Sequence, residues 1–167
     1  SEMSIVAMKA GKVIGFITND DEFDLLDEED GKKDPKADEP YPNKNLDDFA
    51  HCFEELLFQI DETMDIEAKE ECENAYITAL AVHPDYFKTG VASTLFKISL
   101  AVTLYYRYKR LLTFTTNGFI GDKLEDLGFA KMCKGVKASE FELEDGDTPF
   151  EGLKEDFTVT YHGIDLV

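Results

Sequence analysis

The sequence contains no tryptophan, only three cysteines and three histidines, and no long apolar run. Cys52, Cys72 and Cys133 are odd in number and lack the spacing of zinc ligands or of a disulfide framework. They are typical of reduced thiols and predict a cytoplasmic protein without a bound metal. No stretch reaches the roughly eighteen apolar residues of a membrane span, and the first residues lack a signal-peptide pattern. We therefore expect neither a membrane segment nor a secretory leader.

Basic residues are scarce, with 17 Lys and Arg against 36 Asp and Glu, and the net charge is −19. This charge repels the phosphates of nucleic acid, so nucleic acid is not an expected partner. A small cationic molecule or a basic protein is a better match. Acidic residues can also serve only to keep a protein soluble, and that simpler interpretation stays open. Assembly of the chain as a homodimer also stays open.

The acids are densest between Asp20 and Pro42, where eleven of them stand against three lysines and are followed by prolines. Such a segment can bury little apolar surface. We expect a flexible acidic insertion at about 20–42.

The remaining hydrophobic pattern predicts a single domain, residues 1–167, in which strands and helices alternate. The expected strands are a hairpin over 4–18, a buried strand over 76–82, a strand over 111–116 and late strands around 139–144 and 157–162. The expected helices are 46–64, Gly90 to about Lys109, and 119–127. Asn45 or Asp47 would cap the first helix, and Gly128 would stop the third. Arg107, Lys109 and Arg110 are expected in the last turn of the second helix, where cations suit the dipole. The order predicts an α/β fold with a mixed sheet and helices on both faces.

The most informative segment runs from Ala79 to Ala92, ALAVHPDYFKTGVA. It predicts a buried strand, a proline turn, a polar loop and a helix that starts at Gly90. A helix N-terminus leaves several backbone N–H groups without an intrahelical partner, and its dipole is positive there, so it can bind a phosphate or pyrophosphate. Gly90 would let the backbone approach such a ligand closely. We therefore expect an anionic cofactor at this loop.

These residues resemble the GNAT superfamily of acetyl-CoA-dependent N-acetyltransferases. The family pattern of a strand, a V-x-P turn and (Gln/Arg)-x-x-Gly-x-(Gly/Ala) is matched by Val82-His83-Pro84 and by the run from Phe87 to Ala92. A second family feature, an asparagine after the next strand and a later Leu-Gly-Phe, is matched by Asn117 and by 127–129. The chain is most similar to arylalkylamine N-acetyltransferases of the invertebrate type, over 4–18 and roughly 43–165.

The resemblance implies a GNAT-like acyl-CoA N-acyltransferase fold with acetyl-CoA as cosubstrate and no metal. The pantetheine arm would pair with backbone groups where the strand splays from its neighbour, and backbone amides of the loop would hold the pyrophosphate. Phe87 stands where the family has Gln or Arg, so one polar contact is lost. The implied cofactor-binding residues are Leu80, Ala81, Val82, Phe87, Lys88, Thr89, Gly90, Val91, Ala92, Ser93 and Asn117. Ser93 could instead bond its own backbone, and Asn117 could instead cap the following helix.

The amine-binding half departs further from the family. Leu124 stands where many GNAT enzymes have a tyrosine acid, and Tyr76 and Thr78 stand where the vertebrate branch has two histidines. Thr116 and Ile120 match two serines of the invertebrate branch. The candidate catalytic residues are therefore Tyr76, Thr78 and Thr116. The family's usual first strand and helices, which carry the carboxylate base in the invertebrate branch, have no counterpart, so the chain is expected to be N-terminally short.

The resemblance implies an enzyme that transfers acetyl to the primary amine of a small cationic substrate by direct attack in a ternary complex, with an arylalkylamine favoured. Polyamines or diamines are the alternative acceptors. A degenerate module that binds CoA without turnover is a second alternative, and an acidic binding protein is a third. His51, His83 and His162 are expected to be structural.

Overall fold

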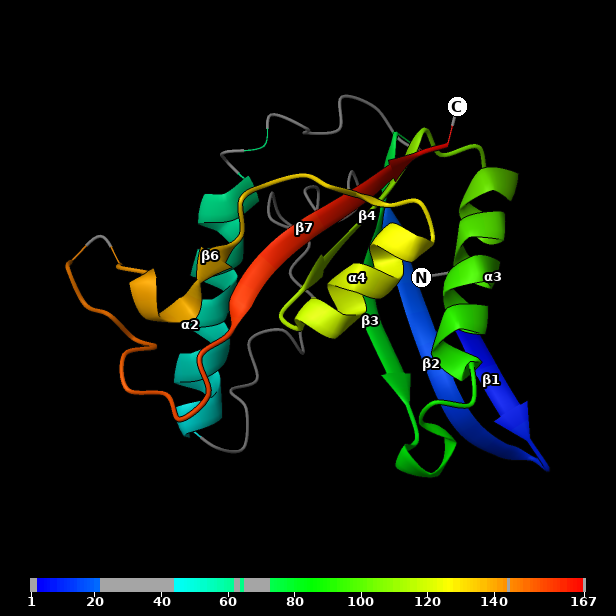
Figure 1. Cartoon of the computed structure of the whole chain (residues 1–167), viewed down its shortest axis with the longest axis horizontal. Helices are drawn as coiled ribbons and strands as arrows, with labels where there is room; N and C mark the ends of the chain where they lie inside the picture. The colour runs from blue at the N-terminus through cyan, green and yellow to red at the C-terminus, as the bar shows by residue number, and fades with distance from the viewer. Residues whose placement is uncertain (1–2, 22–43, 62–63, 65–72, 144, 167) are drawn as a thin grey trace. The chain divides into compact units, whose positions relative to one another are not determined.

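The computed structural model describes residues 3–21, 44–61, 64, 73–143 and 145–166, with only the backbone of 44–48 and 61. Its elements are β1 (Ile5–Lys9), β2 (Lys12–Asp21), α2 (Lys44–Asp61), β3 (Asn74–Val82), the 3₁₀ turn η1 (Pro84–Tyr86), α3 (Val91–Tyr105), β4 (Arg110–Thr115), α4 (Gly118–Asp126), β5 (Ala130–Lys131), β6 (Val136–Lys137), the 3₁₀ turn η2 (Ala138–Glu140) and β7 (Thr158–Asp165). The strands form a mixed sheet in the order β1-β2-β3-β4-β7-β5, and β6 pairs with β7 (Figure 1). This confirms the predicted α/β class. None of the described helices is both long and apolar enough to cross a membrane.

The chain divides into two compact units, which are described in turn. The first unit comprises Ser1–Asp27, Ala68–Thr113 and Ile164–Val167, and the second comprises Glu28–Glu67 and Phe114–Gly163. The first therefore contains the hairpin, β3, the loop after it and α3. The second contains α2, α4 and most of β7.

In the first unit, α3 packs against β1, β2 and β3 and runs alongside the hairpin (Figure 1). Its buried side chains recur at helical spacing, and Leu95 and Phe96 contribute apolar surface to the core. Gly15 of β2 permits the close approach. A β-carbon on Gly15 would lie 2.9 Å from the carbonyl oxygen of Ala81 and 3.2 Å from Cγ1 of Val91. The first turn of α3 is thus held near the sheet because Gly15 has no side chain.

Gly15→Ala is expected to lower the free energy of unfolding by about 1–3 kcal/mol, because the backbone of β3 cannot move away as a flexible side chain could. Gly118→Ala is the matched control, since a β-carbon there would meet nothing within 4 Å. It should be neutral or stabilising by up to about 1 kcal/mol, as for Gly→Ala in a helix. Urea denaturation of both variants measures the difference. Equal stabilities would contradict the close packing of α3 on β2.

The end of β2 differs from the prediction, because Asn19, Asp20 and Asp21 belong to the strand rather than to an acidic loop. The reason is that their side chains have partners. The Asn19 side chain is fully buried, donates to the Met3 carbonyl at 2.9 Å and accepts from the Ser99 hydroxyl. The nearly buried Asp21 carboxylate accepts from the Tyr108 hydroxyl at 2.9 Å. The rest of the expected insertion, 22–42, lies outside the described residues.

The end of α3 also differs from the prediction. The helix stops at Tyr105, and Arg107 follows with a φ of 67° in the left-handed region that ends helices. The amide of Tyr108 donates back to the Thr103 carbonyl at 3.1 Å. Arg107, Lys109 and Arg110 therefore do not lie in the helix's last turn, and the expectation that they complement its dipole was wrong.

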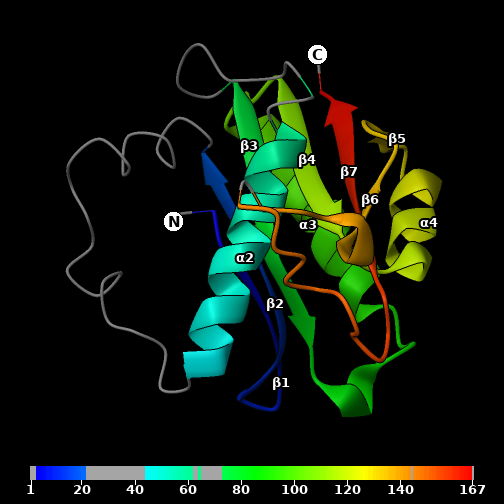
Figure 2. The same cartoon turned by 90° about the vertical axis from the view of Figure 1, so that its left-hand side faces the viewer.

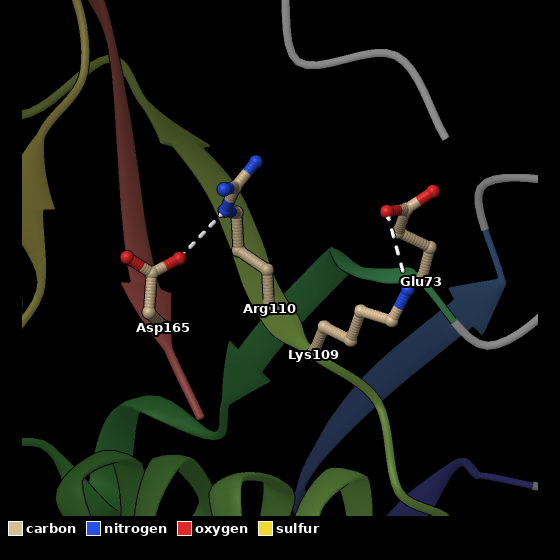
Figure 3. A network of polar contacts seen from close by, with 4 residues as sticks. All are labelled: Glu73, Lys109, Arg110 and Asp165. Carbon is tan, nitrogen blue, oxygen red and sulfur yellow. Dashed lines mark hydrogen bonds and ion pairs between the residues drawn. The ribbon is translucent and has the colours of Figure 1, made fainter. Parts of the chain in front are cut away.

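Lys109 and Arg110 instead join the ends of strands. Lys109 Nζ lies 3.4 Å from Oε1 of Glu73, just ahead of β3, and Arg110 Nε donates to Oδ1 of Asp165, at the end of β7, at 2.8 Å (Figure 3). The two side chains reach in different directions from neighbouring positions. These two ion pairs link the start of β4 to the residue that precedes β3 and to the end of β7.

The core of the second unit is a cluster of aromatic rings. Phe150 is 1% exposed and contacts the rings of Phe49, Phe141 and Phe157 at centroid distances of 5.5 to 5.8 Å. Phe49 belongs to α2, which lies beside the segment that carries Phe150 (Figure 2). The α2 helix confirms the helical spacing of the sequence. It begins at Lys44, so Asn45 and Asp47 lie inside it and the expectation that one of them is the N-cap was wrong.

The predicted strand over 139–144 was wrong. The described residues there form η2 and a following loop, because Ser139 bonds to Asp156 and Phe141 turns into the aromatic cluster. The alternating apolar pattern of this segment reflects one buried phenylalanine rather than a strand face. The final strand is confirmed as β7, while the two-residue strands β5 and β6 were not predicted.

Candidate functional site

An open strand edge follows Ile77 in the first unit. The parallel pairing of β3 with β4 runs from Asn74–Arg110 to Ile77–Thr113, whereas the antiparallel pairing with β2 continues to Val82. The amide of His83 donates to the Ile14 carbonyl at 2.8 Å. Because backbone groups alternate along a strand, those of Leu80 and Val82 point away from β2, toward the edge that pairs with no other strand among the described residues. This edge offers donors and acceptors to an extended ligand.

The loop after β3 is held by its own hydrogen bonds. The amide of Tyr86 donates to the His83 carbonyl at 2.9 Å, and that of Phe87 donates to the Pro84 carbonyl at 3.0 Å. His83 Nδ1 accepts from the Asp85 amide at 3.3 Å, so this histidine has the structural role that the sequence predicted. The Thr89 hydroxyl donates to the Tyr86 carbonyl at 2.7 Å. These internal hydrogen bonds therefore define the shape of the loop.

Two left-handed residues, Lys88 with φ 62° and Gly90 with φ 87°, bring the chain into α3. Gly90 is the N-cap and supplies no side-chain hydrogen bond to the helix. Within the described part of the chain, no hydrogen bond uses the amides of Lys88, Gly90, Val91, Ala92 and Ser93. A concave run of free amides at a helix N-terminus attracts anions through the same donors and dipole that bind phosphate elsewhere.

Two positive charges lie at or beside this loop. Lys88 is exposed, and Lys9 at the hairpin tip places its Nζ 5.1 Å from the centre of the Tyr86 ring. These two cations lie at or beside the loop in a chain whose net charge is −19. Phe87 is 61% exposed, so the residue in the family's Gln/Arg position lies at the surface. Ser93 is also exposed.

Asn19 contacts α3, so the neighbouring Asp20 and its partner Tyr76 lie on the face of the sheet away from α3. Thr78 lies on the same face, because its hydroxyl bonds to Asp20. Tyr76 pairs with Asp20 across the strands. The Thr78 hydroxyl donates to Oδ2 of Asp20 at 2.6 Å and lies 2.9 Å from the Thr18 hydroxyl. The structure thus brings both β3 candidates beside a carboxylate.

Thr116 and Asn117 lie in the second unit. The Asn117 side chain accepts from the Phe119 amide at 2.9 Å and caps α4, one of the two roles that the sequence left open. Leu124, at the family's tyrosine position, is fully buried. Thr116 lines a cavity of about 410 Å³ between α4 and β7.

The cavity is polar and mainly acidic. Its charged lining consists of Asp122, Glu125 and Asp156 against Lys131. The Ser139 hydroxyl donates to Asp156 at 2.7 Å, and this hydrogen bond holds the pKa of Asp156 below its usual value. Asp156 therefore stays negative at neutral pH, and the cavity is suited to a cation.

His162 of β7 also lines this cavity and is 2% exposed. Its Nε2 lies 3.9 Å from Oε1 of Glu125, and its Nδ1 makes no hydrogen bond to the described residues. Gly121 leaves room for the ring, since a β-carbon there would lie 3.3 Å from Cε1 of His162. Burial is the main cause that lowers the pKa of His162, while the backbone of Thr160 and then the Glu125 carboxylate oppose the shift. The imidazole is therefore neutral at pH 7.

A pH dependence of stability follows from His162. Below its usual pKa of 6.5 the unfolded chain binds a proton that the folded chain does not, so acidification favours unfolding. The stability contribution is complete above pH 6.5, falls by up to about 1.4 kcal/mol per pH unit below it, and levels off under the folded pKa. His162→Gln should remove this slope, and His51→Gln, on an exposed position of α2, should keep it. Urea melts between pH 7.5 and pH 5 measure both; a wild-type slope in His162→Gln would contradict the assignment.

Sequence reasoning missed Asp20 and His162. Asp20 was assigned to the acidic insertion, although the alternating pattern of β2 could have been extended to it. His162 was expected to be structural, which nothing contradicts, but its place beside the cavity was not predicted, although a histidine in the middle of a buried strand needs a polar environment. In both cases the partner, Thr78 or Glu125, is distant in the sequence.

No protein-family model and no curated protein sequence matches the chain. Solved structures do match it. Mosquito arylalkylamine N-acetyltransferase like 5b has a TM-score of 0.72 and 18% identity, over 98% of this chain and 74% of that one. An agmatine N-acetyltransferase mutant has a TM-score of 0.72 and 12% identity, over 98% and 76%. The C-terminal condensation domain of Ebony, in complex with beta-alanyl-dopamine, has a TM-score of 0.72 and 15% identity, over 98% and 72%.

These likenesses extend over nearly the whole chain, although few residues are identical. They agree with the fold expected from the strand, loop and helix around Gly90. The chain has the fold of the GNAT N-acetyltransferases.

Proposed function

We propose that the chain is an acetyl-CoA-dependent N-acetyltransferase that acetylates the primary amine of a small cationic substrate, with an arylalkylamine favoured. The observation that carries this proposal is the open edge of β3 together with the free amides at the start of α3. A pantetheine arm would pair with Leu80 and Val82. The pyrophosphate would bind the amides from Lys88 to Ser93.

The same backbone groups also support acetyl-CoA as the acetyl donor. Acetyl-CoA combines an extended amide-containing arm with a pyrophosphate, and the edge and the loop follow each other in that order along the chain. One of the fold neighbours is a condensation domain, so the fold alone does not select acetyl-CoA. The free amides of the loop, which could hold a pyrophosphate, support the proposal of a CoA thioester. A backbone N–H of the open edge could also stabilise the negative charge that develops on the thioester oxygen.

The acidic cavity supports a cationic acceptor. Asp122, Glu125 and Asp156 outnumber Lys131 there, and the net charge of the chain, −19, favours the approach of a cation. Fold neighbours are named for arylalkylamines and for agmatine. A polyamine or diamine is therefore the second candidate, favoured by the number of carboxylates around the cavity.

The first test is thermal unfolding with and without acetyl-CoA. At 100 times its Kd the ligand should stabilise the protein by about 2.7 kcal/mol. S-acetylpantetheine, which has the arm but no pyrophosphate, should stabilise it much less. No shift at millimolar acetyl-CoA would contradict the proposal.

The second test is release of CoA in the presence of tyramine, serotonin, agmatine or spermidine. We expect release to depend on the amine, with the aryl amines turned over faster than the polyamines. The reverse order would assign the polyamine alternative. Binding of acetyl-CoA without release for any amine would indicate a CoA-binding module without turnover.

A further inference from the structure

Three polar side chains, two on β2 and one on β3, are linked by hydrogen bonds in the first unit. Oδ2 of Asp20 accepts from the Thr78 hydroxyl at 2.6 Å, and Oγ1 of Thr18 lies 2.9 Å from Oγ1 of Thr78. The Thr18 hydroxyl also lies 3.4 Å from the Ala79 carbonyl, a longer and weaker contact. All three side chains lie on the face away from α3.

The direction of these hydrogen bonds follows from counting protons. A hydroxyl has one proton and two lone pairs. Because Thr78 gives its proton to Asp20, the short contact with Thr18 must be a bond that Thr18 donates. Thr78 thus has one proton bound toward Asp20, one lone pair filled by Thr18 and a second lone pair free to accept. Its side chain is exposed, so a ligand can reach that lone pair.

The place of Thr78 in the sheet is unusual. Thr18 pairs with Ala79 and Asn19 pairs with Ile77, so Thr78 is an extra residue in a β-bulge. It is also the first residue of β3 beyond the pairing with β4. Bulges commonly redirect a side chain next to an active site. Here the bulge puts a hydroxyl, supported by a carboxylate, at the beginning of the open edge.

We propose that Thr78 and Asp20 form a proton relay for acetyl transfer, in which Thr78 contacts the reacting amine and Asp20 acts through it. This inference rests on the proposed function and names the group that receives the amine's proton. Sequence reasoning had sought a carboxylate base on a helix ahead of the hairpin. The structure offers one within β2.

The chemistry decides when the relay acts. A carboxylate is a far weaker base than an alkylamine, so it does not efficiently deprotonate the free ammonium. The ammonium ion therefore first loses one proton to solvent. The neutral amine then attacks the thioester carbon, forming the C–N bond while the π electron pair of the carbonyl moves to its oxygen, which becomes negative. Its nitrogen is now positive, and its proton is far more acidic than that of an ammonium ion.

The proton then moves along the two side chains. Thr78 Oγ1 accepts it from the nitrogen and passes its own proton to Asp20. The oxyanion collapses, the C–S bond breaks and the CoA thiolate leaves with the electron pair. The proton returns from Asp20 through Thr78 to the thiolate, which gives the N-acetyl amine, CoA thiol and the original carboxylate.

The test is steady-state kinetics of the full chain with acetyl-CoA and tyramine, or agmatine if that amine is turned over faster. Asp20→Asn and Thr78→Val should each lower kcat at least about 100-fold, as for loss of a general base. The KM for acetyl-CoA should change little. The double variant should lose no more than either single one, because the two groups act as a unit. Thr78→Ser keeps the hydroxyl and should restore most of kcat.

Glu151→Gln is the matched control, since Glu151 also accepts from a threonine hydroxyl, that of Thr148 at 2.9 Å, on an exposed loop of the second unit. It should keep wild-type kcat. Acetyl-CoA stabilisation of each variant separates the two proposals: stabilisation with lost turnover supports the relay, and no stabilisation of the wild type contradicts the proposed function itself. If Asp20→Asn does not fold, the kcat of Thr78→Val tests the relay, because Thr78 is exposed and its replacement does not alter the core.

Two outcomes would overturn the relay. One is a kcat within threefold of wild type in Thr78→Val. The other is a raised KM for the amine with unchanged kcat in Asp20→Asn, which would make Asp20 an anchor for the cation. A normal solvent isotope effect on kcat that disappears in Asp20→Asn would add support that a merely structural role does not provide.

Discussion

Gly90→Glu is expected to abolish acetyl-CoA binding and, with it, acetyl-CoA-dependent thermal stabilisation. Two causes act together. Gly90 has a φ of 87°, a conformation that costs an L-residue about 1–2 kcal/mol. The new carboxylate would also lie at the free amides of α3, where it would compete with the pyrophosphate and repel it. We expect the Kd to rise at least about 100-fold, as for a loss of roughly 2.7 kcal/mol.

Gly152→Glu is the matched control, because Gly152 also has a left-handed φ, 81°, and space for a β-carbon. It should cost similar folding stability and leave acetyl-CoA binding unchanged. Gly90→Ala separates the two causes, because it introduces the strain without the charge. Its affinity should lie between those of wild type and Gly90→Glu. Isothermal titration of all three measures this, and wild-type affinity in Gly90→Glu would remove the loop as the phosphate site.

Phe150→Ala is expected to produce the largest loss of stability, about 3–5 kcal/mol in the free energy of unfolding. The ring is 1% exposed and contacts three other phenylalanines, so its removal leaves a cavity that the loop around it cannot fill. Because a domain has only about 5–15 kcal/mol in total, this is a large share of the stability, and the denaturation midpoint should fall clearly while the folded state stays populated near room temperature.

Phe58→Ala controls for the loss of a phenylalanine as such. Phe58 lies on α2 and is 57% exposed, and alanine is a better helix former. Its stability should stay within about 0.5 kcal/mol of wild type. Chemical denaturation followed by circular dichroism compares the two variants. A loss below about 1 kcal/mol in Phe150→Ala would contradict the central place of this ring.

The parts of the fold that were predictable depend on local pattern. The alternation around β3, the proline turn, Gly90 and the helical spacing of α3 identify a strand, a loop and a helix without tertiary information. The same residues identify the candidate phosphate site, because free amides are a property of the helix start itself. What the loop binds stays a proposal.

The parts that were not predictable depend on distant partners. Asp20 and Asp21 look like the beginning of an acidic loop until the hydroxyls of Thr78 and Tyr108 are known to donate hydrogen bonds to them. Arg110 looks like a cation in the last turn of a helix until Asp165, 55 residues further along the chain, is known to be its partner. Charged side chains do not reveal such partners through periodicity. For this reason the cofactor half of the site could be predicted in more detail than the amine half.

The uncapped start of α3 has a consequence for local motion. The amides of Val91, Ala92 and Ser93 have no acceptor within the described part of the chain, so their protons should exchange with deuterium at nearly unprotected rates in the free protein. Those of Leu95 and Phe96, one turn further along, should exchange slowly because the helix and the core protect them. A bound pyrophosphate would supply the missing acceptors and slow only the first group. The exchange rates of one helical turn would then report whether the donor is bound, independently of any amine.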